Sequence, residues 1–297
     1  MIILNRVIEI KDLNYKFKDK QVFKNLNIEF EENKIYGLLG KNGAGKTTLI
    51  NIMTNQLMSK NGDIKVLGLD PRINPEVLEN ICVVREREFY NNEVKVKTIF
   101  NMYSSFYSNY DKELEKKLCE VFDINQKARY KKLSRGMKTS VSNIVGICSN
   151  AKITIFDEPT IGLDALNRKE FYDILLESYV NKKRSIIIST HLIEEIGELL
   201  EKVAIIKDGS VLVNDYVENI NTKSYYISGN KEDLKRLKIL KGVKEVRSFG
   251  NIATYSYYGD IGEGDMKIIN ECNIELDNMN LQDLFININK KGVKVYE

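Results

Sequence analysis

The sequence predicts an α/β fold with a largely parallel, buried central sheet, and three observations support that prediction. A Gly-rich segment, residues 40–48, lies between an apolar run and a helix-like run, the context of a phosphate-binding turn between a strand and a helix. Two further apolar strands, Ile153–Phe156 and Ser185–Ile188, flank a helical segment, Ala165–Val180. A strand–helix–strand order of this kind makes the strands parallel and buries them on both faces.

Composition and charge narrow the possible function classes. The chain has 297 residues, of which 43% are hydrophobic, enough for one large or two modest packed domains. Its 45 basic and 42 acidic residues nearly balance, which argues against a protein that coats nucleic acid. No apolar run reaches the ~20 residues that cross a bilayer, and the N-terminus lacks the apolar core of a signal peptide. We expect a soluble, cytoplasmic chain whose membrane-spanning partners are separate subunits.

The cysteines are not arranged as a metal or disulfide framework. Cys82, Cys119, Cys148 and Cys272 lie far apart and form no C-x-x-C pair. Zinc ligands and disulfide scaffolds need closer, paired spacings. We therefore expect these cysteines to be small, buried apolar side chains.

The first elements along the chain predict an antiparallel β region. Between residue 6 and about residue 36, short runs alternate apolar and polar side chains, as strands with one buried face do. The tight-turn signal Asn61-Gly62 precedes one more strand. The expected strands are Val7–Ile10, Gln21–Phe23, Leu26–Phe30 and Ile64–Leu67.

A helical insert and a hairpin surround the strand–helix–strand unit. Residues 97 to 130 are rich in Lys, Glu and Leu, with apolar residues at helical spacing. After the unit, Val203–Ile206 and Ser210–Val213 flank the turn signal Asp208-Gly209 and predict a hairpin.

The pattern changes near residue 222, and the tail predicts a small α+β module. Its elements follow a βαββαβ order, which is typical of a split βαβ or ferredoxin-like arrangement. We expect its many tyrosines to be cross-strand packing pairs rather than a binding surface. The expected strands are Ser224–Ser228, Val243–Ser248, Ile252–Tyr258 and Ile274–Leu276, and the expected helices are Lys231–Ile239, Asp265–Glu271 and Leu281–Asn289.

The Gly-rich segment matches the phosphate-binding loop pattern G-x-x-x-x-G-K-S/T. Its glycines let backbone N–H groups turn toward phosphates, and the helix that begins near Lys46 adds its positive end. Lys46 supplies a cation for the β- and γ-phosphates, and the Thr47 hydroxyl can ligate Mg²⁺. The predicted nucleotide-binding residues are Gly40, Lys41, Asn42, Gly43, Ala44, Gly45, Lys46, Thr47 and Thr48.

Two polar strand ends supply the candidate catalytic groups. Asp157 and Glu158 directly follow the apolar strand Ile153–Phe156, so they lie at the sheet edge beside the phosphate-binding loop. Asp157 is the candidate Mg²⁺ ligand, through Thr47 or water, and Glu158 is the candidate general base for the attacking water. His191, the only histidine, follows the next apolar strand and can hydrogen-bond the γ-phosphate or that water.

One further motif points to a family. Leu133-Ser-Arg-Gly-Met137 lies just after the helical insert. With it, the chain resembles the ATP-binding cassette (ABC) ATPases in the identity, order and spacing of its motifs. The signature of that family is LSGGQ, from which Arg135 and Met137 depart. The Ser134 hydroxyl and backbone N–H groups at a helix start can aim at a phosphate, and Gly136 permits close approach.

The resemblance implies further site residues. Gly162-Leu-Asp164 matches the loop that touches the partner subunit in this family, which adds Asp164 to the nucleotide site. Phe17 falls where an aromatic side chain stacks on adenine, with Tyr15 as the competing residue. Glu86 falls at the usual Gln of the Q-loop. A carboxylate there can meet Mg²⁺ but cannot donate a hydrogen bond when it is ionised.

The resemblance covers about residues 6 to 220 and implies an ABC-type P-loop NTPase fold. Residues 1–221 would form the nucleotide-binding domain, with an antiparallel β subdomain and a helical subdomain at about residues 87–140. Residues 222–297 would form the small α+β module. In that module Asn280–Ile286 looks like the LEDLF segment near the C-terminus of ABC-2-type exporter ATPases.

The function implied by the resemblance is ATP hydrolysis to ADP and phosphate, coupled to transport through separate membrane permease subunits. ATP bound by one subunit would be capped by Ser134 and Gly136 of a second subunit, most simply another copy of this chain. We expect Mg²⁺ as cofactor, no nucleic-acid partner and a location on the inner face of the cell membrane. Export of a drug, antibiotic or lantibiotic-like compound is the first hypothesis, and an importer ATPase or a non-transport regulatory ATPase is the alternative.

Other P-loop proteins fit the motifs less well. A translation-factor relative would carry two cassettes in one chain, whereas this chain has one. A chromosome or DNA-repair relative would separate the motifs with a long coiled coil, but only about 85 residues separate Lys46 from Ser134. An unrelated kinase or GTPase would leave the signature-like motif unexplained.

Overall fold

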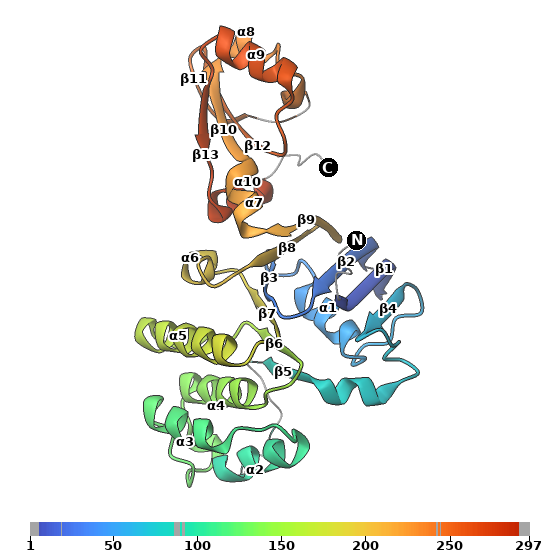
Figure 1. The fold of residues 1–297 in the computed structure, drawn as a ribbon, viewed down its shortest axis with the longest axis vertical. Coiled ribbons are helices and arrows are strands. Elements are labelled where there is room, and N and C mark those ends of the chain that lie inside the picture. The colour runs from blue at the N-terminus through green and yellow to red at the C-terminus, as the bar shows by residue number, and fades with distance from the viewer. Residues whose placement is uncertain are drawn as a thin grey trace. The chain divides into compact units, whose positions relative to one another are not determined.

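A six-stranded sheet forms the centre of the first part of the chain (Figure 1). Its strand order is β5-β6-β7-β3-β8-β9, and the pairs from β5 to β8 are parallel. In the five parallel strands, β3, β5, β6, β7 and β8, nearly every residue is buried and none is exposed. This confirms the predicted α/β fold with a largely parallel sheet. The strands are β3 (Ile35–Leu39), β5 (Ile81–Arg85), β6 (Ile153–Asp157), β7 (Ser185–Thr190), β8 (Lys202–Lys207) and β9 (Ser210–Tyr216).

The computed structural model describes residues 6–18, 20–85, 90, 93–241, 243 and 245–290. It divides into two compact units, Met1–Val211 and Leu212–Glu297, and strand β9 crosses the division. The sequence predicted a boundary between residues 221 and 222, which stays a prediction. In the described part of the chain, no helix has both the length and the apolar character needed to span a membrane.

A three-stranded antiparallel sheet lies in the first unit, in the order β2-β1-β4. Its first two strands are longer than the predicted runs, because bulges interrupt the alternation without ending the pairing. At two such places Asp12 and Asn25 adopt positive φ, and the side chains of Asn27 and Asn14 accept their backbone N–H groups. The strands are β1 (Arg6–Phe17), β2 (Lys20–Glu31) and β4 (Asp63–Val66).

Helix α1 (Lys46–Met53) shares one hydrophobic core with residues of both sheets, which fixes its first turn beside the end of β3. On another part of the parallel sheet, α4 packs on β5 and β6, and α2 and α3 pack on α4 (Figure 1). Gly146 permits this approach, because a Cβ there would lie 2.5 Å from the Val84 side chain. The remaining elements are η1 (Pro75–Asn80), α2 (Val96–Phe106), α3 (Lys112–Val121), η2 (Tyr130–Lys132), α4 (Arg135–Cys148), α5 (Ala165–Asn181) and α6 (Ile193–Ile196).

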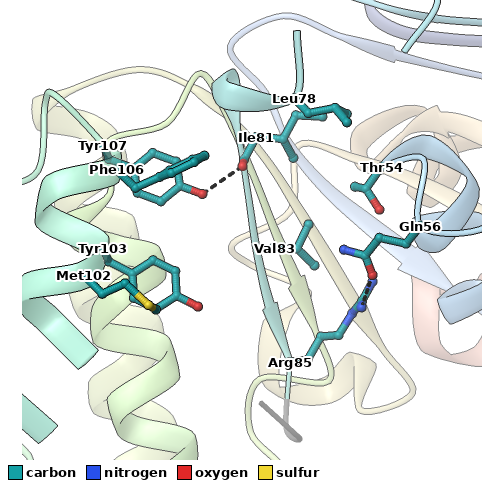
Figure 2. A pocket seen from close by; sticks show the side chains of 10 residues that line it. All are labelled: Thr54, Gln56, Leu78, Ile81, Val83, Arg85, Met102, Tyr103, Phe106 and Tyr107. Carbon is teal, nitrogen blue, oxygen red and sulfur yellow. Dashed lines mark hydrogen bonds between the residues drawn. The ribbon is translucent and has the colours of Figure 1, made fainter. Parts of the chain in front are cut away.

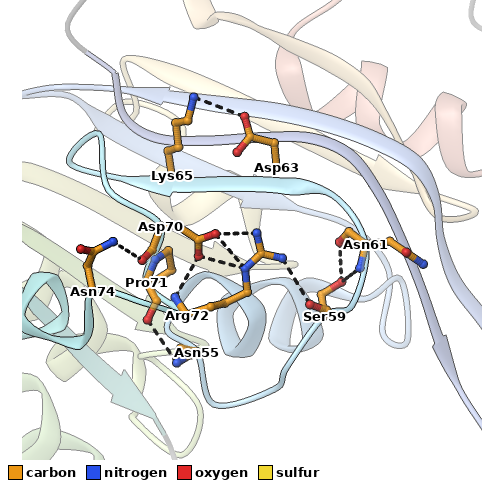
Figure 3. A network of polar contacts seen from close by, with 9 residues as sticks. All are labelled: Asn55, Ser59, Asn61, Asp63, Lys65, Asp70, Pro71, Arg72 and Asn74. Atoms are coloured by element: carbon orange, nitrogen blue, oxygen red, sulfur yellow. Dashed lines mark hydrogen bonds and ion pairs between the residues drawn. The ribbon is translucent and has the colours of Figure 1, made fainter.

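A polar network fixes the segment between α1 and η1 (Figure 3). Arg72 pairs with Asp70 at 2.6 Å and donates a 3.3 Å hydrogen bond to the Ser59 carbonyl. Asn55 donates to the Pro71 carbonyl, and Asn74 donates to the Asp70 carbonyl. The hydrogen bonds from the Arg72 guanidinium lower the pKa of the Asp70 carboxyl.

The second unit is built on a four-stranded antiparallel sheet in the order β11-β12-β10-β13. β12 lies between β10 and β11 and is antiparallel to both. β10 lies between β12 and β13 and is antiparallel to both. This order of strands is the split βαβ arrangement. Tyr225 pairs with Tyr257 across the sheet and both pack on the core, as predicted. The elements are α7 (Val217–Lys223), β10 (Ser224–Asn230), α8 (Lys231–Leu234), η3 (Lys238–Leu240), β11 (Glu245–Phe249), β12 (Ile252–Tyr258), α9 (Glu263–Glu271), β13 (Glu275–Asn278) and α10 (Leu281–Asn289).

Two sequence predictions need correction. The helix expected over Lys231–Ile239 is instead the short α8 followed by the 3₁₀ turn η3. The buried side chain of Asp265 accepts the Lys238 N–H at 2.7 Å, so that N–H is not used to continue α8. Three of the four cysteines are buried as expected, but Cys272 is partly exposed.

Candidate nucleotide-binding and catalytic site

The Gly-rich loop joins β3 to α1, and its glycines are required by local geometry. Gly45 has φ of +106°, and a Cβ there would lie 2.8 Å from the Phe23 ring. A Cβ on Gly40 would lie 2.8 Å from the Ile206 carbonyl oxygen. Gly43 also has positive φ but faces open space. The backbone therefore takes a compact turn that side chains would prevent, and the N–H groups of the first turn of α1 follow it.

Lys46, Glu158 and His191 meet at the ends of three neighbouring strands, β3, β6 and β7. The Lys46 ammonium donates to the Gly40 carbonyl at 2.7 Å and lies 3.4 Å from the Glu158 carboxylate. His191 Nδ1 lies 3.0 Å from the same carboxylate. Lys46 is 6% exposed, whereas the His191 side chain is 40% exposed, so the cluster runs from the buried loop to the surface. The structure thus brings the three predicted catalytic side chains together.

The backbone of Glu158 is unusual. Its φ is +55°, a conformation that costs a non-glycine residue about 1–3 kcal/mol and persists only where the surroundings impose it. Its N–H donates to the Ser189 carbonyl at 2.9 Å, and the Ser189 hydroxyl donates to Asp157 at 2.8 Å. Ser189 is a site residue that the sequence analysis missed. Its signal was its place at the same level as Asp157 in the next parallel strand.

The donors present suit Mg²⁺. Asp157 is a buried carboxylate at the end of β6, and Thr47 is an exposed hydroxyl in the first turn of α1. Among the described residues, no group of three or more His, Cys, Asp or Glu side chains could hold a metal by itself. Mg²⁺ binds through one or two protein oxygens plus substrate phosphates, so Asp157 and Thr47 fit that ion.

A second group of predicted site residues lies where α4 begins. Ser134 caps α4 and accepts the Met137 N–H at 3.2 Å. Gly136 lies against the turn at Gly162, because a Cβ on Gly136 would be only 2.6 Å from the Gly162 carbonyl oxygen. Asp164 caps α5 and accepts the Asn167 N–H. The signature-like motif and the Gly162–Asp164 turn are therefore in direct contact within one chain.

The two candidates for adenine stacking differ in exposure. Phe17, at the end of β1, is 57% exposed. Tyr15 is partly buried and packs on the hydrophobic core. The geometry favours Phe17 as the side chain free to contact a ligand. Glu86, the predicted Q-loop residue, lies outside the described residues.

Comparisons with known proteins agree with this geometry. The model of the ABC transporter family matches residues 23–161. The uncharacterized ABC transporter ATP-binding protein MJ1023 of Methanocaldococcus jannaschii is 33% identical over 74% of this chain and 81% of its own length. The bacitracin transport ATP-binding protein BcrA of Bacillus licheniformis is 26% identical over 96% of this chain and 98% of its own.

The fold comparison points the same way. A solved ATP-binding subunit of an ABC transporter superposes with a TM-score of 0.65, at 21% identity over 73% of this chain and 92% of its own. That similarity establishes the fold, and the sequence relatives establish the family. The chain therefore belongs to the ABC transporter family, as an ATP-binding subunit that hydrolyses ATP to power transport.

Proposed function

We propose that this chain powers export of a drug, antibiotic or lantibiotic-like compound through separate permease subunits. The observation that carries the proposed chemistry is the cluster of Lys46, Glu158 and His191 beside the Gly-rich loop. It combines a phosphate-binding cation, a carboxylate base and a hydrogen-bonding imidazole within contact distance. Hydrolysis of ATP needs these groups near one phosphate.

Each side chain has a role that follows from its contacts. Lys46 would bind the β- and γ-phosphates, which would compete with Glu158 for the ammonium group. Glu158 would then accept a proton from the attacking water, while His191 would hold that water or the γ-phosphate. Thr47 and Asp157 would hold Mg²⁺, which supplies positive charge against the phosphates when bound.

The complete site would need two copies of the chain. The Ser134 hydroxyl accepts one hydrogen bond from its own helix, and its proton remains available to donate. Together with Gly136 and the N-terminal end of α4, it could cap the γ-phosphate of ATP held by the Gly-rich loop of a second copy. We propose a homodimer in which ATP lies between the two copies, with Asp164 at the contact.

A groove in the first unit offers a place for the permease (Figure 2). It has a volume of about 460 Å³ and lies between α2 on one side and β5 with the end of α1 on the other. Met102 and Phe106 of α2 line it and remain 53% and 59% exposed. Exposed large apolar side chains around a cavity suit a partner protein. We propose that a permease segment binds there, which would hold the chain on the inner face of the membrane.

The kind of transport rests on the relatives. The similarity to BcrA, named as a bacitracin transport protein, covers both units of this chain, and Asn280–Ile286 resembles the exporter segment. We therefore propose export as the direction. An importer ATPase or a regulatory ABC ATPase without transport is the alternative. Transport of labelled bacitracin into inverted vesicles that contain this chain and its permease tests the direction, because an exporter accumulates its cargo inside them.

The catalytic assignment is tested with Glu158→Gln. The variant keeps the shape of the side chain but removes the base, so it should bind ATP and lose at least about 100-fold in turnover. With ATP and Mg²⁺ it should accumulate as closed dimers, which size-exclusion chromatography detects. Glu113→Gln, which changes an exposed carboxylate in α3, serves as the matched control and should behave like wild type. Unchanged turnover of Glu158→Gln would contradict the assignment of the base.

A further inference from the structure

The segment that follows Glu158 is attached to helix α4 by two buried side chains. Asn143 Nδ2 donates a 2.8 Å hydrogen bond to the Pro159 carbonyl. One turn earlier in the helix, Thr139 Oγ1 lies 2.9 Å from the Ile161 carbonyl oxygen and 3.2 Å from the Arg135 carbonyl oxygen of its own helix, so the shorter bond is the one to Ile161. Both side chains are at most 2% exposed. Buried polar groups are costly unless they are hydrogen-bonded, so these two donor contacts favour one placement of the segment, although Asn143 Oδ1 has no partner in the described part of the chain.

The first turn of α4 touches the same segment directly. Gly136 lies so close to the Gly162 carbonyl that no side chain fits between them. The Arg135 side chain also packs on Gly162, since a Cβ on Gly162 would lie 3.0 Å from Arg135 Cγ. Gly162 itself has φ of +84°, which suits glycine. Thus α4 contacts residues 159–162 from its first turn to its third.

The rest of the segment is held by strand β7, which ends just before His191, and by helix α5. The Glu158 N–H donates to the Ser189 carbonyl of β7, and the Tyr172 hydroxyl of α5 lies 3.5 Å from Thr160 Oγ1. Burial raises the pKa of Tyr172 to about 12, so its hydroxyl keeps its proton at neutral pH. Glu158 has a positive φ, a conformation that persists only where the surrounding residues impose it, and the segment after it is part of those surroundings.

We propose that Thr139 and Asn143 are positioning residues that couple the capping end of α4 to the Glu158 base of the same chain. The inference rests on the proposed function, in which Ser134 at the start of α4 caps ATP held by a second copy. Capping fixes the first turn of α4. The bonds from Thr139 and Asn143 then fix the segment after Glu158. Each ATP would in this way position the base that acts on the other ATP.

The test compares two substitutions at one position. Thr139→Val has nearly the same shape but cannot donate to Ile161, whereas Thr139→Ser keeps the hydroxyl. In the full-length chain with ATP and Mg²⁺, Thr139→Val should lower kcat about 10-fold with KM changed less than about 2-fold, which is less than the roughly 100-fold loss that misplacing a catalytic group by about 1 Å can cause. Thr139→Ser should retain most of the wild-type kcat. Both should bind ATP as monomers with wild-type affinity.

A double-mutant cycle separates coupling from simple loss of structure. In single-turnover assays with radiolabelled ATP, Ser134→Ala removes the capping hydroxyl and slows hydrolysis. If α4 transmits the effect of capping, adding Thr139→Val to Ser134→Ala should lower the hydrolysis rate by less than about a further 2-fold. If the two substitutions act independently, their rate losses should multiply. Rate losses that multiply, or a wild-type kcat for Thr139→Val, would overturn this inference but not the proposed function. A wild-type chain that hydrolyses no ATP, with or without its permease, would instead overturn the proposed function.

Discussion

The contact between Gly136 and Gly162 makes a sharp prediction about stability. In Gly136→Ala the new Cβ would lie 2.6 Å from the Gly162 carbonyl oxygen, whereas ordinary contact begins near 3.4 Å. The two backbones would have to separate by about 0.8 Å, against the hydrogen bonds from Thr139 and Asn143 that hold them together. Overpacking of this kind costs about 1–3 kcal/mol, and the helix propensity of Ala returns at most about 1 kcal/mol.

With the middle of that range as the cost, the net loss should be about 1–2 kcal/mol, which for a unit of this size lowers Tm by roughly 2–8 °C. Differential scanning calorimetry without nucleotide measures it, so that an effect on ATP binding does not contribute. The matched control is Gly264→Ala, which also changes the second residue of a helix but meets nothing within 4 Å. It should be neutral or stabilising. A Gly136→Ala protein as stable as wild type would refute the close approach of α4 to the Gly162 turn.

Two further predictions concern other parts of the first unit. Phe17→Ala should weaken ATP binding about 10-fold in a titration with a fluorescent ATP analogue, because loss of base stacking costs about 1–3 kcal/mol, and it should not lower Tm. Tyr15→Ala should instead lower the stability of the chain. The reverse pattern would reassign the stacking residue to Tyr15. Asp70→Asn should lower the free energy of unfolding by at most about 1 kcal/mol at pH 7. Because the folded-state pKa of Asp70 lies below its ordinary value of 3.8, the stabilisation is present above that value and is lost as the pH falls through the folded-state pKa. Urea unfolding from pH 7 to pH 3 should show the difference between wild type and variant shrinking at the acid end, and a constant difference would contradict the role of the Arg72 pair.

The sequence alone was sufficient to predict which catalytic candidates lie together. Lys46 follows β3, Glu158 follows β6 and His191 follows β7, and parallel strands put their carboxyl ends at one edge. The chemistry therefore follows from local patterns plus one rule of topology. The α/β class was predictable for the same reason, since apolar strands alternate with helices along the chain.

What the sequence did not reveal depends on contacts between distant residues. The expected helix over Lys231–Ile239 contains good helix formers, but after α8 the backbone bonds three residues back, and the Lys238 N–H donates to Asp265, far along the chain. The bulges of β1 and β2 likewise depend on asparagine side chains from the opposite strand. Local propensity is a weak guide where a distant side chain takes a backbone N–H group.

The same distinction explains why the positioning role of α4 was not predictable. Thr139 and Asn143 stand four residues apart on a helix whose buried positions are otherwise mostly apolar, and in the sequence they look like minor interruptions of that pattern. Only the fold shows that each faces a carbonyl of the segment after Glu158. The motif residues are those expected to bind the nucleotide, and they can be recognised by residue type. Residues that connect two motifs are determined by the distance and the polar groups between those motifs, so their identity becomes apparent only in the folded structure.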